Sequence, residues 1–464
     1  MMKLSLAKLA ALFANDLPVA EQAKYQNQYF QGISTDTRTL QPGQLFIALE
    51  GENYDGHLFV EEAQKKGAVA AVVKRKSAAS LPQILVSDTV QALGALAHYW
   101  RKQFNLPAIG LTGSNGKTTL KNMIASILRA ACDNQPDSVL STEGNLNNHI
   151  GVPLMLSRLQ TSHRYAVIEM GMNHFGEISY LTQMVCPTVA IITNACPAHL
   201  QGVSDLAGVA RAKGEIFSGL SQTGAAILNR EDTYYSYWKG LIGQRLCLTF
   251  GLNAPADIYA IMHASTDSLK QAVTLVRPGE RIDVALPLLG QHNVMNALAA
   301  TAACTALHID AQAIKAGLEN VEPAKGRLQL HAFARDIRLI DDTYNANPAS
   351  LTAAVKVLAK FAGNKILILG DMRELGDSSS DLHASMGETI RQAGIDQLFT
   401  YGDLSEHISK NFGENAYHFR DQKVLVDTLR KQLRPNSTLL IKGSRYMKME
   451  NVVAALKEVL CHDH

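Results

Sequence analysis

The chain has 464 residues, enough for about three domains, and its 47% hydrophobic and 19% charged residues are typical of a globular protein with a full core. A formal net charge of +2 gives no support for nucleic-acid binding, and no apolar stretch is long enough to span a bilayer as a helix, so we expect no membrane insertion. The six scattered cysteines exclude a zinc knuckle and a disulfide framework and favour a reducing cytoplasm.

The first 86 residues predict a small α/β domain. Leu6, Leu9 and Phe13 lie on one helical face, which favours an amphipathic first helix over a signal peptide. Apolar runs at 45–49, 69–73 and 84–86 predict buried strands, and a helix is expected at 57–66.

A polar loop follows an early strand of this domain. It contains Ser34, Asp36, Thr37 and Arg38. Such a loop suits a nucleotide or a phosphate, and it is equally compatible with a solvated turn. The residues alone leave both interpretations open.

Residues 109–119 predict a phosphate-binding loop. Upstream of it, Ser87 or Asp88 is expected to cap a helix that runs to about residue 104. Residues 109–119 then read as the end of an apolar strand, a glycine turn and the start of a second helix. Backbone N–H groups, a helix N-terminus and Lys117 would then point at one polyphosphate, while the Thr118 hydroxyl would hold Mg²⁺.

The glycine spacing in this loop differs from the common P-loop. Five residues separate Gly110 from Gly116, and only two separate Gly113 from Gly116. The common motif has four residues between its first glycine and the Gly-Lys pair. The compressed spacing indicates a particular subclass of NTPase.

Polar residues at the ends of neighbouring strands are candidate partners of the loop. Alternating strands and helices predict a mostly parallel sheet, which binds ligands at the carboxyl ends of its strands. Glu169 follows the strand at 165–168 and suits Mg²⁺, although a solvated carboxylate is the simpler alternative. His199 follows the strand at 189–192 and could be a metal ligand, a substrate contact or a loop histidine.

Two further segments carry candidate residues. Lys213 lies in a helix predicted at 207–219, where an exposed lysine is the simplest interpretation. Asn293 and Asn296 lie on one face at the start of another helix and could read a purine edge or cap the helix. The alanine-rich stretch 297–307 predicts a closely packed internal helix.

A third domain is expected after a linker at Pro323. Strands at 337–340, 365–369 and 439–441 each end in a polar loop, which predicts another small parallel sheet similar to a dinucleotide-binding fold. The Gly-x-Gly-x-x-Gly loop is absent, so dinucleotide binding is not expected. The expected domains are therefore 1–86, 87–322 and 323–464, all of the α/β class, with the P-loop in the central domain and a Rossmann-like sheet in the third.

These landmarks together resemble the Mur ligase superfamily, the ATP-dependent amide ligases of peptidoglycan assembly, over essentially the whole chain. The resemblance implies catalytic roles for Lys117, Glu169, His199 and Lys213, the last as a carbamate, and two Mg²⁺ ions held by Thr118, Glu169, His199 and Lys213. It implies that ATP is bound by Thr112, Gly113, Ser114, Asn115, Gly116, Lys117, Thr118, Thr119, Asn293, Asn296, Arg327 and Asp342. It implies that the first domain binds the UDP end of the substrate, and it implies substrate contacts at Asp36, Thr37, Arg38, Asn145, Asn147 and Asn148.

Four stretches narrow the resemblance within the superfamily. They are residues 143–153, 342–348, 370–376 and 442–445. They are most similar to the ligases that add D-alanyl-D-alanine to UDP-N-acetylmuramoyl-tripeptide. The resemblance thus implies an acyl-phosphate intermediate, these two substrates, ATP and a cytoplasmic bacterial enzyme. The sequence does not fix the oligomeric state, and a monomer is the default expectation.

Two other functions remain open from the sequence. A sister ligase, such as one that adds the third amino acid or a folylpolyglutamate-type ligase, would share the ATP site and differ in the first and third domains. A P-loop NTPase that acts as a switch would need no carboxylate substrate and no acceptor amine. The ligands of a second metal ion that the resemblance implies, His199 and Lys213, argue against the switch.

Overall fold

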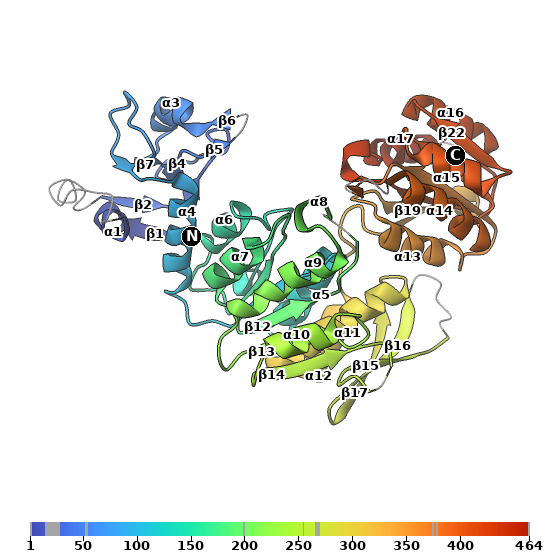
Figure 1. The fold of residues 1–464 in the computed structure, drawn as a ribbon, viewed down its shortest axis with the longest axis horizontal. Helices are drawn as coiled ribbons and strands as arrows, with labels where there is room; N and C mark the ends of the chain where they lie inside the picture. Colours follow the sequence, from blue (N-terminus) through green and yellow to red (C-terminus); the bar gives the residue numbers. More distant parts are fainter. Residues whose placement is uncertain are drawn as a thin grey trace.

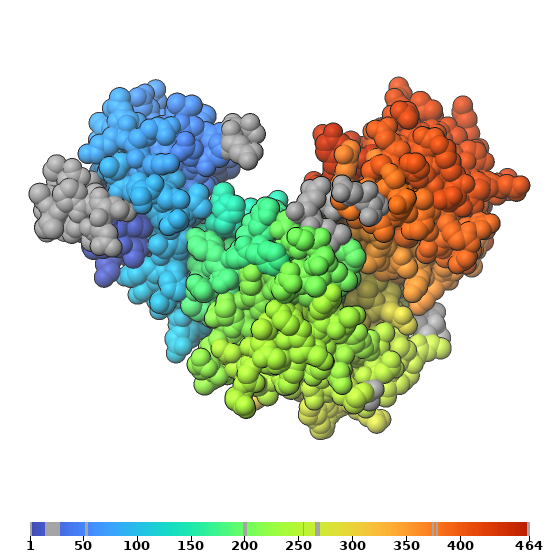
Figure 2. Space-filling model, in the orientation of Figure 1, coloured from blue at the N-terminus to red at the C-terminus, as the bar shows by residue number. Residues whose placement is uncertain are grey.

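The computed structural model describes residues 2–13, 28–51, 54–197, 200–253, 255–264, 270–373, 375–376 and 379–462. It has the α/β class and the three-part architecture expected, with the first and last parts on opposite sides of the central one (Figure 1). The space-filling view in Figure 2 shows the two outer parts as separate lobes with an open gap between them. Across the described ranges, no helix is long and apolar enough to cross a membrane.

The N-terminal part is built on a parallel sheet with the strand order β3-β4-β7-β8. The bounds are β3 (Ile33–Ser34), β4 (Leu45–Ile47), β7 (Ala70–Val73) and β8 (Gln83–Leu85), with η2 (Gly56–Phe59) and α3 (Val60–Lys65) between β4 and β7. The first helix is α1 (Leu6–Leu12), and it buries Leu6 and Leu9 as the amphipathic pattern predicts. It lies between β1 (Lys3–Ser5) and β2 (Tyr29–Gln31), an antiparallel pair that had no prediction.

Helix α4 (Thr89–Arg101) leads into the central part. Asp88 is its cap, because its carboxylate accepts the N–H groups of Val90 and Gln91 at 2.8 and 3.0 Å. The central sheet is parallel throughout, with the order β10-β11-β9-β12-β13-β14. The bounds are β9 (Ala108–Thr112), β10 (Val139–Ser141), β11 (Tyr165–Glu169), β12 (Val189–Ile192), β13 (Ala225–Asn229) and β14 (Leu246–Phe250). Strand β9 is interior, so the loop after it has neighbours on both sides.

Two layers of helices cover this sheet. One face packs against α5 (Lys117–Ala130), α11 (Gln291–Ala306) and α12 (Ala311–Glu319). The other packs against α6 (Gly151–Leu156), α7 (Glu177–Val185), α9 (Leu206–Gly214) and α10 (Tyr235–Leu241). Residues 230–289 had no predicted element, and besides α10 and β14 they form an antiparallel sheet of β15 (Tyr259–Met262), β16 (Gln271–Arg277) and β17 (Glu280–Leu286).

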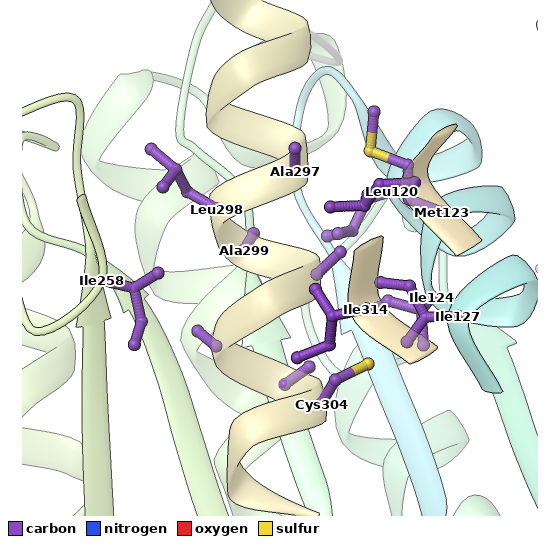
Figure 3. Close-up of a cluster of buried hydrophobic side chains, with 14 of the residues drawn as sticks. Leu120, Met123, Ile124, Ile127, Ile258, Ala297, Leu298, Ala299, Cys304 and Ile314 are labelled. Atoms are coloured by element: carbon purple, nitrogen blue, oxygen red, sulfur yellow. The ribbon is translucent and has the colours of Figure 1, made fainter. Parts of the chain in front are cut away.

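The alanine-rich helix α11 is closely packed, as the sequence predicts. Figure 3 shows Ala297 and Cys304 on the side of α11 that faces α5 and α12, whereas Leu298 lies on the other side, toward Ile258. All three residues are fully buried. Glycine permits similarly close contact between α5 and α12: a Cβ added at Gly317 would lie 2.3 Å from the Cα of Ile127. Small side chains thus let these three helices pack together behind the phosphate loop.

The C-terminal part has a second six-stranded sheet, with the order β18-β19-β23-β20-β21-β22. Its strands are β18 (Gln329–Phe333), β19 (Ile337–Asp342), β20 (Asn364–Gly370), β21 (Gln397–Tyr401), β22 (Ala416–Phe419) and β23 (Ser437–Lys442), and only β18 is antiparallel. Helices α13 (Pro348–Leu358), α14 (Ser379–Gln392) and α15 (Ser405–Phe412) cover one face, and α16 (Gln422–Gln432) and α17 (Glu450–His462) cover the other.

Candidate functional site

A cavity of about 590 Å³ lies where the carboxyl edge of the central sheet meets α11 and the C-terminal part. Its size is that of a small-molecule site. The predicted site residues that line it are Ser114, Asn115, Gly116, Lys117, Thr118, Thr119, Asn145, Asn147, Asn148, Glu169, Lys213, Asn293, Asn296, Arg327 and Asp342. The structure therefore brings together residues that are more than 200 positions apart in the sequence.

The loop between β9 and α5 has the conformation of a phosphate cradle. Gly116 precedes α5 with φ of 84°, and a Cβ there would lie 2.5 Å from the Oδ1 of Asn296, so only glycine fits. The Lys117 amine folds back over the loop and donates to the Gly113 carbonyl at 2.6 Å. Burial lowers the pKa of Lys117, the Glu169 charge raises it and the Arg327 charge lowers it.

The segment after β12 fixes the shape of this loop. The Ser114 hydroxyl donates to the Cys196 carbonyl at 2.9 Å, and the Asn115 N–H donates to Asn194 Oδ1 at 3.0 Å. The Thr193 hydroxyl donates to the Asn115 carbonyl at 2.7 Å. Asn194 was not among the predicted site residues. It lies at the carboxyl end of a strand beside the loop, and ligands bind at such strand ends in a parallel sheet, so its position could have identified it.

Glu169 is buried at the tip of β11, so the solvated-carboxylate interpretation is wrong. Its Oε2 accepts the Thr118 hydroxyl at 3.1 Å, and its Oε1 accepts the Asn147 amide at 2.8 Å. A hydroxyl and a carboxylate oxygen side by side fit Mg²⁺, which binds few protein ligands and takes the rest from water and phosphate. Among the described residues no three His, Cys, Asp or Glu side chains form a metal cluster.

Lys213 is 2% exposed, so the interpretation as an exposed helical lysine is wrong. Helix α10 covers α9 here, because the buried Trp238 indole donates to the Ala210 carbonyl at 2.9 Å. Burial, and then the charge of Lys117, lower the pKa of Lys213 well below its usual value. A buried amine that prefers the neutral form can react with CO₂ to give a carbamate. The predicted partner His199 lies outside the described residues, and its role stays a prediction.

The two asparagines of α11 face the phosphate loop. The Asn293 amide donates to the Leu289 carbonyl at 2.8 Å, and the Asn296 amide donates to Asn293 Oδ1 at 3.3 Å. Gly290 is the N-cap of α11, and neither asparagine accepts a helix N–H, so the capping interpretation does not hold. Both are buried in the cavity wall, and the Oδ1 of Asn296 lies against Gly116.

The C-terminal part contributes a buried ion pair and an arginine. Asp342 ends β19, and it accepts the Lys442 amine at 2.5 Å and the Leu328 N–H at 3.2 Å. The Arg327 guanidinium lies 4.1 Å from the centre of the Tyr344 ring, and its buried Nε has no hydrogen-bond partner in the described ranges. An unpaired cationic donor beside the phosphate loop fits an anionic ligand.

Lys442 and His292 also line the cavity, and neither was predicted as a site residue. Lys442 ends β23 beside Asp342, so its position at the carboxyl end of a parallel strand could have identified it. Burial lowers the pKa of His292 from 6.5 to about 4, with the Asp342 charge opposing the shift and the Lys442 charge adding to it. Nothing in the sequence around His292 signals this burial.

Other predicted residues lie outside the cavity lining. Thr112 is fully buried in β9 beneath the loop, and Gly113 follows it with its carbonyl bonded to Lys117. Asp36, Thr37 and Arg38 follow β3 in the N-terminal part, where Asp36 accepts two guanidinium N–H groups of the exposed Arg38. The structure does not bring that loop to the cavity.

Comparison with known proteins gives matches along most of the chain. Residues 29–101 match the family model described as Mur ligase family, catalytic domain, residues 111–304 match the Mur ligase middle domain, and residues 326–445 match the Mur ligase, glutamate ligase domain.

Two curated relatives are similar over nearly full length. The chain is 44% identical to UDP-N-acetylmuramoyl-tripeptide–D-alanyl-D-alanine ligase of Escherichia coli over 92% of this chain and 93% of that protein. It is 42% identical to the protein of the same name from Haemophilus influenzae over 99% of both chains. A crystal structure of MurF from Acinetobacter baumannii superposes with a TM-score of 0.90 at 35% identity, over 99% of both chains.

Proposed function

The chain belongs to the Mur ligase family, and from this and the cavity we infer that it joins D-alanyl-D-alanine to UDP-N-acetylmuramoyl-tripeptide with ATP. ATP becomes ADP and phosphate, and the product is the UDP-linked pentapeptide precursor of peptidoglycan. One observation carries the proposal: the phosphate loop, Glu169, the buried Lys213 and the Asp342–Lys442 pair line one cavity.

The chemistry requires activation of a carboxylate. A carboxylate does not acylate an amine by itself, so the terminal carboxylate of the tripeptide first attacks the γ-phosphoryl group of ATP and displaces ADP. The resulting acyl phosphate is attacked at its carbonyl carbon by the dipeptide amine. The tetrahedral intermediate then collapses, and inorganic phosphate leaves as the amide forms.

The residues of the central part would position the phosphates. The amide groups of the phosphate loop and the amine of Lys117 would hold the β- and γ-phosphates, which requires Lys117 to leave the Gly113 carbonyl. Arg327, with its unpaired Nε, would contact the phosphates from the C-terminal side. Asn293 and Asn296 would lie toward the nucleoside, and Asp342 toward the ribose.

Charge neutralisation is the second task of the site. Two anions that meet at about 4 Å repel by about 4 kcal/mol at an effective dielectric constant of 20. Two Mg²⁺ ions, one at Thr118 and Glu169 and one at His199 and carbamylated Lys213, would supply the positive charge that offsets this repulsion. The burial of the Lys213 amine, which lowers its pKa, supports the carbamate, and the Thr118–Glu169 contact supports the first ion.

The rest of the chain would hold the long nucleotide substrate. We propose that residues 1–86 bind its UDP end, with Asp36, Thr37 and Arg38 among the contacts. Asn145, Asn147 and Asn148 would lie nearer the sugar and peptide. The central part would span 87–322 and the C-terminal part 323–464. We propose a cytoplasmic monomer, since nothing in the reaction requires a second subunit.

A coupled assay tests the proposed function. The purified protein with ATP and Mg²⁺ should release phosphate only when both UDP-N-acetylmuramoyl-tripeptide and D-alanyl-D-alanine are present, and mass spectrometry should detect the pentapeptide product. Single amino acids in place of the dipeptide separate this reaction from that of a sister ligase. Phosphate release that ignores the dipeptide would count against the proposal and in favour of a simple NTPase.

A further inference from the structure

Helix α5 carries a second buried lysine one turn after Lys117. Lys121 is 6% exposed, and its amine donates to the Thr142 carbonyl at 2.6 Å. None of the carboxylates in the described part of the chain lies within ion-pair distance of it. A buried ammonium without a counter-ion costs free energy, and an apolar side chain of the same length would fill this space at less cost.

Thr142 connects this lysine to the predicted metal ligand. The Thr142 hydroxyl accepts the Glu169 backbone N–H at 2.9 Å, and the Thr142 N–H donates to the Val167 carbonyl at 3.0 Å. Thr142 follows β10 directly, so these bonds fix the end of β10 against the end of β11. The position of the Glu169 carboxylate therefore depends on Thr142.

The contacts close into a ring. From Lys121 they run to Thr142, from Thr142 to Glu169, and from the Glu169 carboxylate to the Thr118 hydroxyl. Thr118 and Lys121 are three residues apart on α5, which completes the ring through one helical turn. Each of its members is thereby held by two neighbours.

The ring also touches the substrate side of the cavity. The second carboxylate oxygen of Glu169 accepts the Asn147 amide at 2.8 Å, and the Asn147 carbonyl accepts the Gly171 N–H at 2.8 Å. Asn147 belongs to the loop 143–148 that begins immediately after Thr142. A shift of Thr142 would therefore move the Mg²⁺ ligand and this loop together.

We propose that Lys121 is a positioning residue that, through Thr142, holds the Glu169 carboxylate and the loop 143–148 in register with the phosphate loop. It touches neither ATP nor the peptide itself. The proposal rests on the proposed function only in the identity of the UDP-linked substrate, whose KM is one of the readouts. The expected effect of Lys121 on Mg²⁺ and nucleotide binding does not depend on which substrates are ligated.

The test compares three variants on this ring with one matched control. Lys121→Met removes the amine and keeps the length of the side chain, Thr142→Val removes only the hydroxyl, and Thr142→Ser keeps it. Ser126→Ala is the control, because Ser126 also lies on α5 but donates to the Gly317 carbonyl of α12, away from the cavity. Calorimetry measures ADP binding against Mg²⁺ concentration, and steady-state assays measure KM and kcat.

In Lys121→Met and Thr142→Val, we expect the Mg²⁺ concentration at half-saturation of ADP binding to rise by about 10–100-fold. Metal-free ADP binding should change by less than about twofold, because the phosphate loop itself is untouched. Lys121→Met should also raise KM for the UDP-linked substrate. Thr142→Ser should behave as the parent protein, and Ser126→Ala should lower the thermal midpoint without changing the Mg²⁺ dependence.

Folded Lys121→Met and Thr142→Val proteins with the parent's Mg²⁺ dependence would overturn the proposal. If Lys121→Met does not fold, the pair Thr142→Val and Thr142→Ser decides: equal Mg²⁺ dependence in both overturns it. Absence of ligation by the parent protein overturns the proposed function instead, and the ADP-binding measurements still test the ring.

Discussion

At the scale of single residues, burial changes what three lysines in and beside the cavity can do. Lys117, Lys121 and Lys213 all have pKa values lowered by burial, and the lowering is greatest for Lys213. The sequence predicts Lys117 from its motif, but it cannot show that α10 covers Lys213, because that contact joins helices that are distant along the chain. For Lys213 the local pattern gave the wrong environment, and the carbamate that the resemblance implies stays a prediction.

Replacement of Lys213 by alanine should lower kcat by about 10²–10³-fold or more, because the site loses a preorganised anion that helps to hold a metal. Bicarbonate should not restore activity, since alanine has no amine to carbamylate. The matched control is Arg211→Ala on the same helix, whose guanidinium lies 5.6 Å from the Phe175 ring centre, and it should keep most of the activity. A fully active Lys213→Ala protein would remove the carbamate from the mechanism.

His292 should make stability depend on pH. Its pKa is about 4 in the folded chain and 6.5 in the unfolded chain, so the unfolded state binds more protons between these values. The folded state therefore gains stability as the pH rises from 4 to 6.5, by about 3 kcal/mol in full. Urea unfolding of the parent and of His292→Gln at pH 5 and pH 7 checks this. Equal pH slopes in both proteins would contradict it.

At the scale of elements, most of the strands and helices that bear the site were predictable. The apolar runs before Glu169 and Asp342 give β11 and β19, and Asp88 caps α4 as expected. The antiparallel sheet β15–β17 was not predicted, although β16 and β17 each have seven residues and β17 largely alternates exposed and buried positions, a period-two pattern that predicts a strand. It lies behind α11 and supports the site without touching it.

The space around two helical glycines, Gly317 at the α5–α12 contact and Gly240 in α10, predicts opposite effects of alanine substitution on stability. Gly317→Ala should destabilise the protein by about 1–3 kcal/mol, since its Cβ would meet the Ile127 backbone at 2.3 Å. Gly240→Ala in α10 should be neutral or stabilising by up to about 1 kcal/mol, because no atom lies within 4 Å of the added Cβ. Thermal unfolding of both variants measures the difference, and equal midpoints would show that α5 and α12 can move apart freely.

At the scale of the whole molecule, a hydrogen bond between Asn347 and Asn115 links the C-terminal part to the phosphate loop. Asn347 caps α13 with its oxygen and donates its amide to Asn115 Oδ1 at 2.9 Å. No local pattern predicts this bond, because its partners are 232 residues apart. The parallel sheets of the three parts could be predicted from the sequence, but the antiparallel β1–β2 pair, the β15–β17 sheet and the way the parts meet at the cavity were not.

Asn347→Ala should raise KM for ATP by about tenfold, because it frees the phosphate loop from the C-terminal part as well as removing a cap. Ser350→Ala is the matched control, since it removes the other half of the same capping box and leaves the Asn347–Asn115 bond in place. Steady-state kinetics distinguishes them. The same KM in both variants would show that the loss reflects the helix cap alone.

The central claim is that the cavity transfers the γ-phosphoryl group of ATP to a carboxylate and not to water. It is tested most directly with UDP-N-acetylmuramoyl-tripeptide labelled with ¹⁸O in its terminal carboxylate. If an acyl phosphate forms, one labelled oxygen must end in the phosphate released with each pentapeptide, and mass spectrometry of that phosphate should detect it. Phosphate that carries no label, because its fourth oxygen comes from water and not from the carboxylate, would contradict the account.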